Sequence, residues 1–308
     1  MADQRADYDL CGWRVASAIA LPDLPPWAGD MRAPDVTIGI GEVPTFERTV
    51  LTTPLVQIAP DGRARFEVTG IGNFLVEEGK RITVAPLLPL DAPDIRLFLL
   101  GSGFGFLCHQ RGVLPIHAAS VDIDGEAVVL AGASGAGKST LAAAFWRRGH
   151  AVLSDDVSPI DLSAGASLIL PSLRRIRLWS DSVKHAGWQS IQMERCRAGL
   201  EKFSRSIASD VRPLPLPPRA IVHLRRQPDT FGGSRFRRLR GRAAAEEFRR
   251  QIYRWRSLVG IAGKTGAMTR SALAASRFPQ HFIMERPVSF DRLDSVVDDI
   301  VATVRAAR

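Results

Sequence analysis

The stretch from Gly132 to Ser139, with the sequence GASGAGKS, fits the phosphate-binding pattern G-x-x-x-x-G-K-[ST] at every fixed position. Residues 127–131 form an apolar run of strand length before it, and residues 140–148 are good helix formers. Gly149 is then placed to end the helix. A strand, a glycine loop and a helix in this order predict an α/β protein that binds a nucleoside triphosphate. A chance match in a chain rich in glycine and alanine is the alternative.

The expected chemistry of the loop follows from its residue types. Glycine adopts backbone angles that a Cβ atom forbids, so the loop turns its N–H groups toward phosphate oxygens, and the following helix adds its positive N-terminus. Lys138 is expected to reach the β- and γ-phosphates, and the Ser139 hydroxyl to bind Mg²⁺. The predicted nucleotide-binding residues are Gly132, Ala133, Ser134, Gly135, Ala136, Gly137, Lys138, Ser139 and Thr140.

The composition is that of a globular protein. The 308 residues suffice for one large or two ordinary domains. Residues 1–7 do not resemble a signal peptide, and the most apolar window, 95–108, is too short to span a bilayer. The three cysteines are few, odd in number and widely spaced, which favours a reducing cytoplasm over a disulfide framework or a zinc site. They are Cys11, Cys108 and Cys196. We therefore expect a soluble cytoplasmic protein with no membrane partner.

The N-terminal region, residues 1–90, is predicted to be rich in β-strands. Apolar and polar residues alternate at 35–40 and 55–58, and residues 65–84 have the pattern of three strands joined by tight turns. The region contains no cluster of titratable residues that would mark a catalytic site. We assign the catalytic domain to residues 91–308.

Besides the helix after the glycine loop, helices are predicted at three places in the catalytic domain. Residues 91–111 are expected to form a buried helix with small residues inside it, and residues 243–256 to form another. The last helix is expected from about Asp291, with one apolar face. Apolar residues on that face are Leu293, Val296, Val297, Ile300, Val301 and Val304.

Two neighbouring carboxylates end the strand that is predicted at 150–157. Asp155 and Asp156 follow Ser139 by only 16 and 17 residues. A carboxylate at the end of a strand that faces a phosphate loop suits Mg²⁺ binding or activation of a hydroxyl group. The alternative is a solvated Asp-Asp turn.

Arginines are concentrated in two places. The predicted strand within 171–179 contains three of them, which either clamp a transferring phosphoryl group or lie on the surface. These are Arg174, Arg175 and Arg177. The block 225–256 has eleven arginines against three acidic residues, a net charge of +8, compared with +9 for the whole chain. No nucleic-acid-binding motif accompanies this block, so a solvated arginine-rich surface is the favoured interpretation, and docking of an acidic peptide is the preferred use if the block binds a partner.

Several features occur together around the loop. His117 lies on the strand before it, Arg148-Gly149-His150 follow at the end of the loop helix, and Asp155-Asp156-Val157 come next. With these features, residues 117–157 resemble the catalytic core of HPr kinase/phosphatase. The wider chain is similar to bacterial HPr-kinase-like proteins, some of which phosphorylate a lasso-peptide precursor on serine. That second resemblance depends on Gln110-Arg111-Gly112, Arg177-Leu178-Trp179 and Glu285-Arg286-Pro287.

The resemblance implies a phosphate-loop kinase core of the type found in HPr kinase and phosphoenolpyruvate carboxykinase. It assigns Asp156 as the acceptor of the proton of the attacked serine and His117 as an active-site histidine. It also assigns Lys138 to the phosphates and Ser139 to Mg²⁺. Asp155 is predicted to be a catalytic residue and a metal ligand. Because the related enzymes assemble as oligomers, a homo-oligomer is also implied.

Two departures from the family pattern concern the metal and the substrate. The family's downstream glutamate ligand is absent, and Asp181, at about the matching distance, is the predicted replacement. Thr140 stands where the bifunctional enzymes have glutamate. The phosphatase activity and HPr as substrate are therefore not expected.

The sequence predicts an ATP- and Mg²⁺-dependent kinase that phosphorylates a serine hydroxyl of a peptide or small protein, such as a lasso-peptide precursor. The alternatives are a kinase for a small metabolite, a non-catalytic nucleotide-dependent sensor and, from the basic block, a nucleic-acid-stimulated ATPase.

Overall fold

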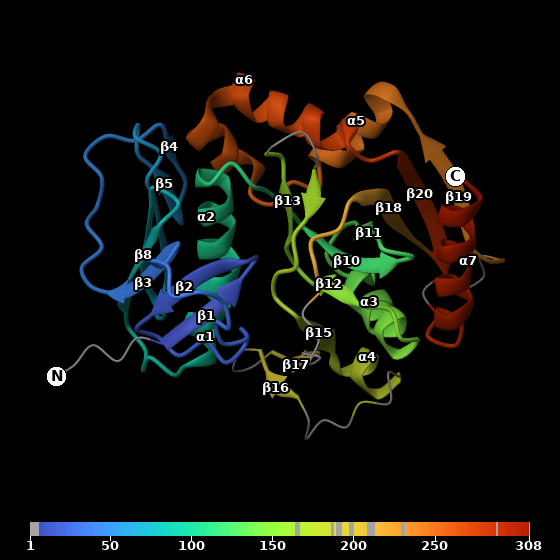
Figure 1. Ribbon diagram of the computed structural model, residues 1–308, viewed down its shortest axis with the longest axis horizontal. Helices are drawn as coiled ribbons and strands as arrows, with labels where there is room; N and C mark the ends of the chain where they lie inside the picture. The colour runs from blue at the N-terminus through green and yellow to red at the C-terminus, as the bar shows by residue number, and fades with distance from the viewer. Residues whose placement is uncertain are drawn as a thin grey trace. The chain divides into compact units, whose positions relative to one another are not determined.

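The computed structural model of the protein describes residues 6–163, 167–185, 188, 193–196, 200–207, 213–228, 232–287 and 289–307 (Figure 1). The chain divides into two compact units, which are described separately. One consists of Met1–Pro115 with Arg254–Arg270, and the other of Ile116–Tyr253 with Ser271–Arg308. Helices and mixed sheets are both present, so the predicted α/β class is confirmed. The assignment of residues 1–90 and 91–308 as separate domains stays a prediction.

The first unit is built on an eight-stranded sheet with the order β1-β2-β3-β8-β7-β6-β5-β4. The strand pattern predicted at 65–84 is correct: β6, β7 and β8 pair antiparallel, with Phe66 opposite Phe74. These two rings stack at 4.6 Å and form part of the core. The strands are β1 (Ala6–Leu10), β2 (Trp13–Ser17), β3 (Val36–Ile40), β4 (Leu51–Thr52), β5 (Val56–Ile58), β6 (Ala64–Val68), β7 (Gly72–Glu77) and β8 (Arg81–Pro86).

The helix predicted at 91–111 is present and has a π-helical middle. It consists of α1 (Pro93–Phe98), the π-helix η1 (Leu99–Gly103) and α2 (Phe104–Gln110). A Cβ atom on Gly103 would lie 3.7 Å from Ile82, an ordinary van der Waals contact, so packing against the sheet does not by itself require a glycine at this position. The side chain of Gln110 donates to the carbonyl oxygens of Gly62 and Val76, which fixes the end of the helix to the strand connections.

The second unit contains a six-stranded sheet with the order β12-β10-β11-β18-β20-β19. The neighbours β11, β18 and β20 run parallel, and the other pairs are antiparallel. Because parallel strands end at the same edge, the ends of β18 and β20 come beside the loop that follows β11. The strands are β10 (Ala118–Ile123), β11 (Glu126–Ala131), β12 (Val152–Ser154), β18 (Pro218–Gln227), β19 (Arg235–Leu239) and β20 (Gln280–Pro287).

Two helices contribute to the core that this sheet forms. From α3 (Lys138–Arg147), Leu141 and Phe145 are fully buried, and from α7 (Leu293–Ala306), Val297 and Ile300 are fully buried in the same cluster. The apolar face predicted for the last helix is therefore confirmed. The cluster packs these two helices beside the loop, with α3 starting directly from it.

The remaining strands are short. Two further sheets have the orders β14-β13-β9 and β15-β17-β16. Their strands are β9 (Leu114–Ile116), β13 (Ser158–Asp161), β14 (Leu168–Ile169), β15 (Arg175–Trp179), β16 (Glu194–Arg195) and β17 (Lys202–Ser206). The helix α4 (Ser180–His185) follows β15 directly.

One helix prediction is wrong. Residues 243–256 do not form a single helix, because α5 (Gly241–Arg249) ends before Arg254 and α6 (Trp255–Ser276) begins after it. Arg254 has a φ of 53°, in the left-handed region that an α-helix cannot include. Within the described ranges, no helix has the length and apolar character needed to cross a bilayer. All three cysteines lie in the described part of the chain and are buried thiols.

Candidate active site

The glycine loop, residues 132–139, connects β11 to α3, as the sequence predicts. Gly132, Gly135 and Gly137 have φ angles of 151°, 79° and 91°, which other residues rarely adopt. A Cβ atom on Gly132 would lie 2.9 Å from the carbonyl oxygen of Leu224, and one on Gly137 would collide with the guanidinium group of Arg286. Close packing against backbone therefore requires glycine at position 132, whereas a side chain at position 137 would displace the end of Arg286.

Lys138 folds over this loop. Its Nζ donates hydrogen bonds to the carbonyl oxygens of Gly132 at 2.9 Å and Ala133 at 3.1 Å, and the residue is buried. Burial lowers the pKa of Lys138, while the charges of Asp155 and Asp156 oppose the shift. The lysine is thus held at the loop, within the electrostatic field of both carboxylates.

Asp155 lies beneath the first turn of α3. Its Oδ1 accepts a hydrogen bond from the Ser139 hydroxyl at 2.9 Å, and its Oδ2 accepts one from the backbone N–H of Arg177 at 3.1 Å. Burial, together with the neighbouring Asp156 charge, raises the pKa of Asp155 to about 6, although both hydrogen bonds favour the carboxylate. The predicted pair of metal-binding oxygens, from Ser139 and Asp155, is therefore brought together.

The side chain of Asp156 points away from Ser139, unlike that of Asp155, and the residue has a left-handed φ of 80°. Its Oδ2 accepts from Nη1 of Arg177 at 2.7 Å, and its Oδ1 lies 3.7 Å from Nδ1 of His117. Burial by itself would raise the pKa of Asp156, but Arg177, His117 and Lys202 hold it below its usual range. Asp156 is therefore a carboxylate at neutral pH.

His117 lies between β9 and β10, where its backbone N–H donates to the carbonyl oxygen of Gln251 at 2.7 Å. Its Nδ1 is 3.0 Å from the backbone oxygen of Asp156 and donates to it in the matching tautomer. Burial and the charge of Lys138 lower the pKa of His117, with Asp156 opposing them. The imidazole is therefore neutral at neutral pH and braces the backbone of Asp156.

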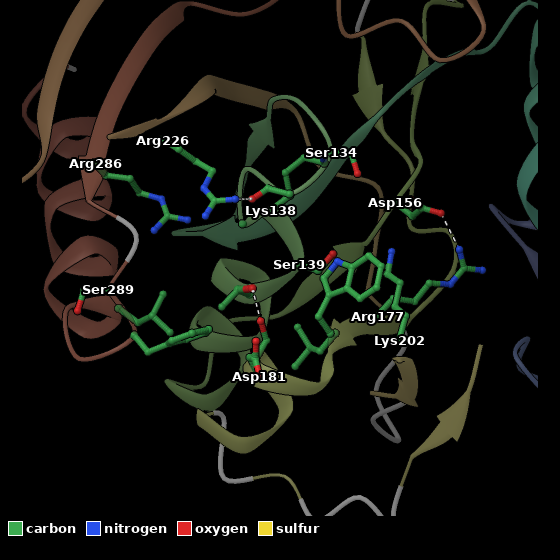
Figure 2. Close-up of a pocket in the computed structure, with 18 of the residues that line it drawn as sticks. Ser134, Lys138, Ser139, Asp156, Arg177, Asp181, Lys202, Arg226, Arg286 and Ser289 are labelled. Atoms are coloured by element: carbon green, nitrogen blue, oxygen red, sulfur yellow. Dashed lines mark hydrogen bonds and ion pairs between the residues drawn. The ribbon is translucent and has the colours of Figure 1, made fainter. Parts of the chain in front are cut away.

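These residues surround one cleft of about 350 Å³ in the second unit (Figure 2). Most of the predicted site residues line it, and Asp155 lies just below, bonded to Ser139. The predicted residues in the lining are His117, Ser134, Gly135, Gly137, Lys138, Ser139, Thr140, Asp156 and Asp181. Gly132, Ala133 and Ala136 belong to the same loop and line a smaller pocket of about 250 Å³ that Ser134 shares.

Two arginines approach the loop from the side opposite Asp156 (Figure 2). Arg226, near the end of β18, donates to the carbonyl oxygen of Gly135 at 3.3 Å, and Arg286, near the end of β20, donates to that of Ala136 at 3.0 Å. Arg286 is buried, and burial, followed by the charge of Arg226, lowers its pKa to about 10, so it remains a cation at neutral pH. The loop therefore has two cations beside it on the side away from Asp156.

Several residues of this cleft were not predicted from the sequence. The missed residues include Lys202, Arg226, Ser289 and Phe290, and Arg286 was noted only as part of a resemblance. Of the three arginines predicted near 171–179, Arg177 alone is among the described lining residues. The alternation of side chains along β15 was the available signal for Arg177, because it places this residue on the face opposite Ile176, which belongs to the core.

Asp181 and Thr140 are at the lower side of the cleft. Asp181 is exposed in the first turn of α4, and its backbone oxygen accepts from Nδ1 of His185 at 2.8 Å. The Thr140 hydroxyl lies 3.2 Å from that of Ser182. Thr140 therefore connects α3 to α4, and the Asp181 carboxylate faces the same cleft as Ser139.

The basic block does not form a single surface. Arg225 pairs with Glu247 at 2.7 Å, and Arg226 belongs to the cleft. Arg237 and Arg238 are exposed on β19, the last strand of the six-stranded sheet. Arg254 belongs to the first unit, and residues 229–231 lie outside the described part of the chain.

The donor set suits Mg²⁺. Mg²⁺ binds oxygen ligands and usually takes only one or two carboxylates from the protein, with the remaining positions filled by phosphate and water. The Ser139 hydroxyl and the Asp155 carboxylate supply such oxygens 2.9 Å apart, and Asp181 adds another carboxylate to the cleft. Among the described residues, no group of three or more His, Cys, Asp or Glu residues is arranged to hold a metal by itself.

Comparisons with known proteins give a distant likeness to solved structures. No family model matches the sequence, and no curated protein matches it. One similar solved structure is the Hpr(Ser) kinase/phosphatase from Coxiella burnetii, with 16% sequence identity and a TM-score of 0.31. The match covers 62% of this chain and 96% of that chain. A likeness this weak assigns neither a family nor an activity to the present chain.

Proposed function

We propose that the protein is an ATP- and Mg²⁺-dependent kinase that transfers the γ-phosphoryl group to a hydroxyl of a peptide or small protein. One observation carries the proposal: residues of the glycine loop, Ser139 and the Asp156–Arg177 pair line a single cleft, and Asp155 is hydrogen-bonded to Ser139 just below it. The combination supplies a phosphate cradle, metal-binding oxygens and a carboxylate for the acceptor, which are the parts that phosphoryl transfer requires.

The residues of the loop bind and orient the nucleotide. Lys138 and the backbone N–H groups of the loop hold the phosphates, and Arg226 and Arg286 add positive charge from the other side. Ser139 and Asp155, with Asp181 as a further candidate, would hold Mg²⁺, which neutralises charge on the β- and γ-phosphate oxygens when bound. Most of the rate enhancement then comes from positioning and electrostatic stabilisation.

Asp156 positions the acceptor hydroxyl and takes its proton. Arg177 occupies one carboxylate oxygen of Asp156, so the other, on the side of His117, is left to face the acceptor. A lowered pKa keeps the group ionised at neutral pH, which a proton acceptor requires. His117 holds the backbone of Asp156 at 3.0 Å and fixes the direction of this carboxylate.

The substrate class rests on the sequence resemblance to HPr-kinase-like proteins, and a lasso-peptide precursor is the specific substrate that we propose. The exposed arginines of β19 give a peptide with acidic residues a place to dock. On this proposal the exposed arginines of β19, rather than the whole basic block, bind the peptide partner, and they do not bind nucleic acid.

The test is phosphotransfer from labelled ATP with Mg²⁺ to the precursor peptide or small protein encoded next to this gene, with the phosphate located by mass spectrometry. Lys138→Ala and Asp156→Asn are the controls. We expect a phosphoserine that is absent with both variants. ATP binding without transfer to a peptide, but with transfer to a free hydroxy amino acid, would replace the peptide kinase by a kinase for a small metabolite. ATP binding without any transfer would favour a nucleotide-dependent sensor.

A further inference from the structure

The cleft continues past the glycine loop to an end with different chemistry. Ser289, Phe290 and Leu293 line this end, at the start of α7 and in the segment before it. Figure 2 shows Ser289 and Asp156 on opposite sides of Lys138 and Ser139. One end of the cleft is therefore ionic, and the other combines an aromatic ring, an aliphatic side chain and a hydroxyl group.

Phe290 is supported from outside the cleft. Its ring stacks on that of His185 with centroids 4.0 Å apart and planes 8° from parallel, and His185 is not part of the lining. The imidazole is fixed in turn by its hydrogen bond to the backbone oxygen of Asp181 at 2.8 Å. Phe290 also packs on the main core of the unit, so it presents a held aromatic surface to the cleft.

The direction in which a nucleotide lies in the cleft follows from the residues on either side of the loop. Asp155 is bonded to Ser139, and Asp156 follows it, so the terminal phosphate belongs on that side. The nucleoside must then extend in the opposite direction, past Arg286, toward Phe290. From this we infer that Ser289, Phe290 and Leu293 form the subsite for the base and ribose of the nucleoside triphosphate.

This inference rests on the proposed function, because it requires a nucleotide on the loop. Aromatic side chains bind bases by stacking, whatever the base, and Ser289 offers a hydroxyl for a ribose or base contact. Arg286 is bonded to the loop at Ala136 and lines the same cleft as the subsite, so its cation is available to a phosphate of the bound nucleotide. The subsite thus adds affinity for the nucleoside that the loop alone does not provide.

The experiment compares binding of ATP and of inorganic tripolyphosphate, each with Mg²⁺, to the full chain by calorimetry. Tripolyphosphate occupies the loop but has no base. Phe290→Ala should weaken ATP binding about tenfold and tripolyphosphate binding less than about twofold, and Phe290→Tyr should restore ATP binding. If Phe290→Ala does not fold, Phe290→Leu replaces it, because leucine keeps apolar volume without the aromatic face. Phe236→Ala is the matched control, since Phe236 is also partly buried on the same core but lies on β19.

The possible outcomes distinguish a failure of the nucleoside subsite from a failure of the proposed function. An unchanged affinity for ATP in the Phe290 variants would overturn the subsite while leaving the kinase proposal intact. Equal weakening of ATP and tripolyphosphate would show that Phe290 supports the loop, which also overturns the subsite. If the wild-type protein binds neither compound, the proposed function fails and the subsite fails with it.

Discussion

Arg177 holds Asp156 by an ion pair of 2.7 Å between Nη1 and Oδ2, in a backbone segment where Asp156 has a φ of 80°. The backbone N–H of Arg177 also binds the neighbouring Asp155. One residue of β15 therefore orients two adjacent carboxylates in different directions. One carboxylate faces the Ser139 hydroxyl, and the other faces the cleft.

Asp156→Asn should reduce phosphotransfer about 100-fold or more, because a positioned proton acceptor contributes at least that factor. ATP binding should be retained, since the hydrogen bond and ion pair of the Asp156 carboxylate are made with residues outside the loop. Asparagine is the appropriate substitution because it tolerates the left-handed backbone at this position. The measurement is kcat under saturating ATP together with the Kd for ATP. More than about a tenth of wild-type turnover in this variant would contradict the role of Asp156 as the proton acceptor.

The local part of this site was predictable from sequence. The loop, its helix and the two carboxylates lie within residues 126–156, where one strand, a glycine pattern and a second strand follow in order. The dipeptide Asp124-Gly125 is another local signal, since Asp-Gly favours a tight hairpin turn, and in the structure both residues have the positive φ that such a turn requires, 57° and 82°.

The site residues that lie far from the loop along the chain were not predictable, because their position depends on the order of strands in the sheet. Arg226 and Arg286 reach Gly135 and Ala136 from 91 and 150 residues away along the chain. Local patterns identify β18 and β20 as strands but do not say that they lie parallel to β11. The predicted helix at 243–256 failed for a related reason: nothing local indicates the left-handed backbone of Arg254.

Gly137→Ala should weaken ATP binding at least about tenfold. A Cβ atom there would displace the guanidinium group of Arg286 and strain a backbone with a φ of 91°, at a cost of about 1–2 kcal/mol for the strain alone. Gly149→Ala is the matched control, because Gly149 has a similar φ of 86° at the other end of α3 but open space around it. The control should lose similar stability in urea unfolding and keep its affinity for ATP. Equal losses of affinity in both variants would mean that Arg286 does not act at the loop.

Charge reversal of the exposed arginines Arg237, Arg238 and Arg240 to glutamate should raise KM for an acidic peptide acceptor without changing KM for ATP. The reason is that these residues lie on or next to β19, away from the lining of the cleft. Steady-state kinetics at two salt concentrations is the measurement, since a charge-dependent KM should also rise with salt in the wild-type protein. An unchanged KM for the acceptor would exclude β19 as its docking site.

His223 should make the stability of the protein fall at acidic pH. Burial, with the charges of His281 and Arg225, lowers its pKa from 6.5 to about 3, and neither ring nitrogen has a hydrogen-bond partner among the described residues. Glu247 lies 3.9 Å from Nδ1, but its carboxylate is already paired with Arg225 and Arg250. Between pH 6.5 and 3 the unfolded chain binds a proton at this position that the folded chain does not. The free energy of unfolding must therefore decrease as the pH falls, by up to about 1.4 kcal/mol per pH unit from this group.

His223→Leu isolates this effect, because leucine is apolar and does not titrate. Urea unfolding at about pH 8 measures the change in packing alone, and the same measurement at about pH 6 and about pH 5 measures the titration. We expect the variant to gain stability relative to the wild-type protein as the pH is lowered, since it no longer has a neutral buried imidazole to protonate on unfolding. His281, whose pKa burial also lowers, remains in both proteins and contributes equally to each. If the free energy of unfolding of the wild-type protein and of the variant depends on pH in the same way, His223 has the same pKa in the folded and unfolded chains, which contradicts this prediction.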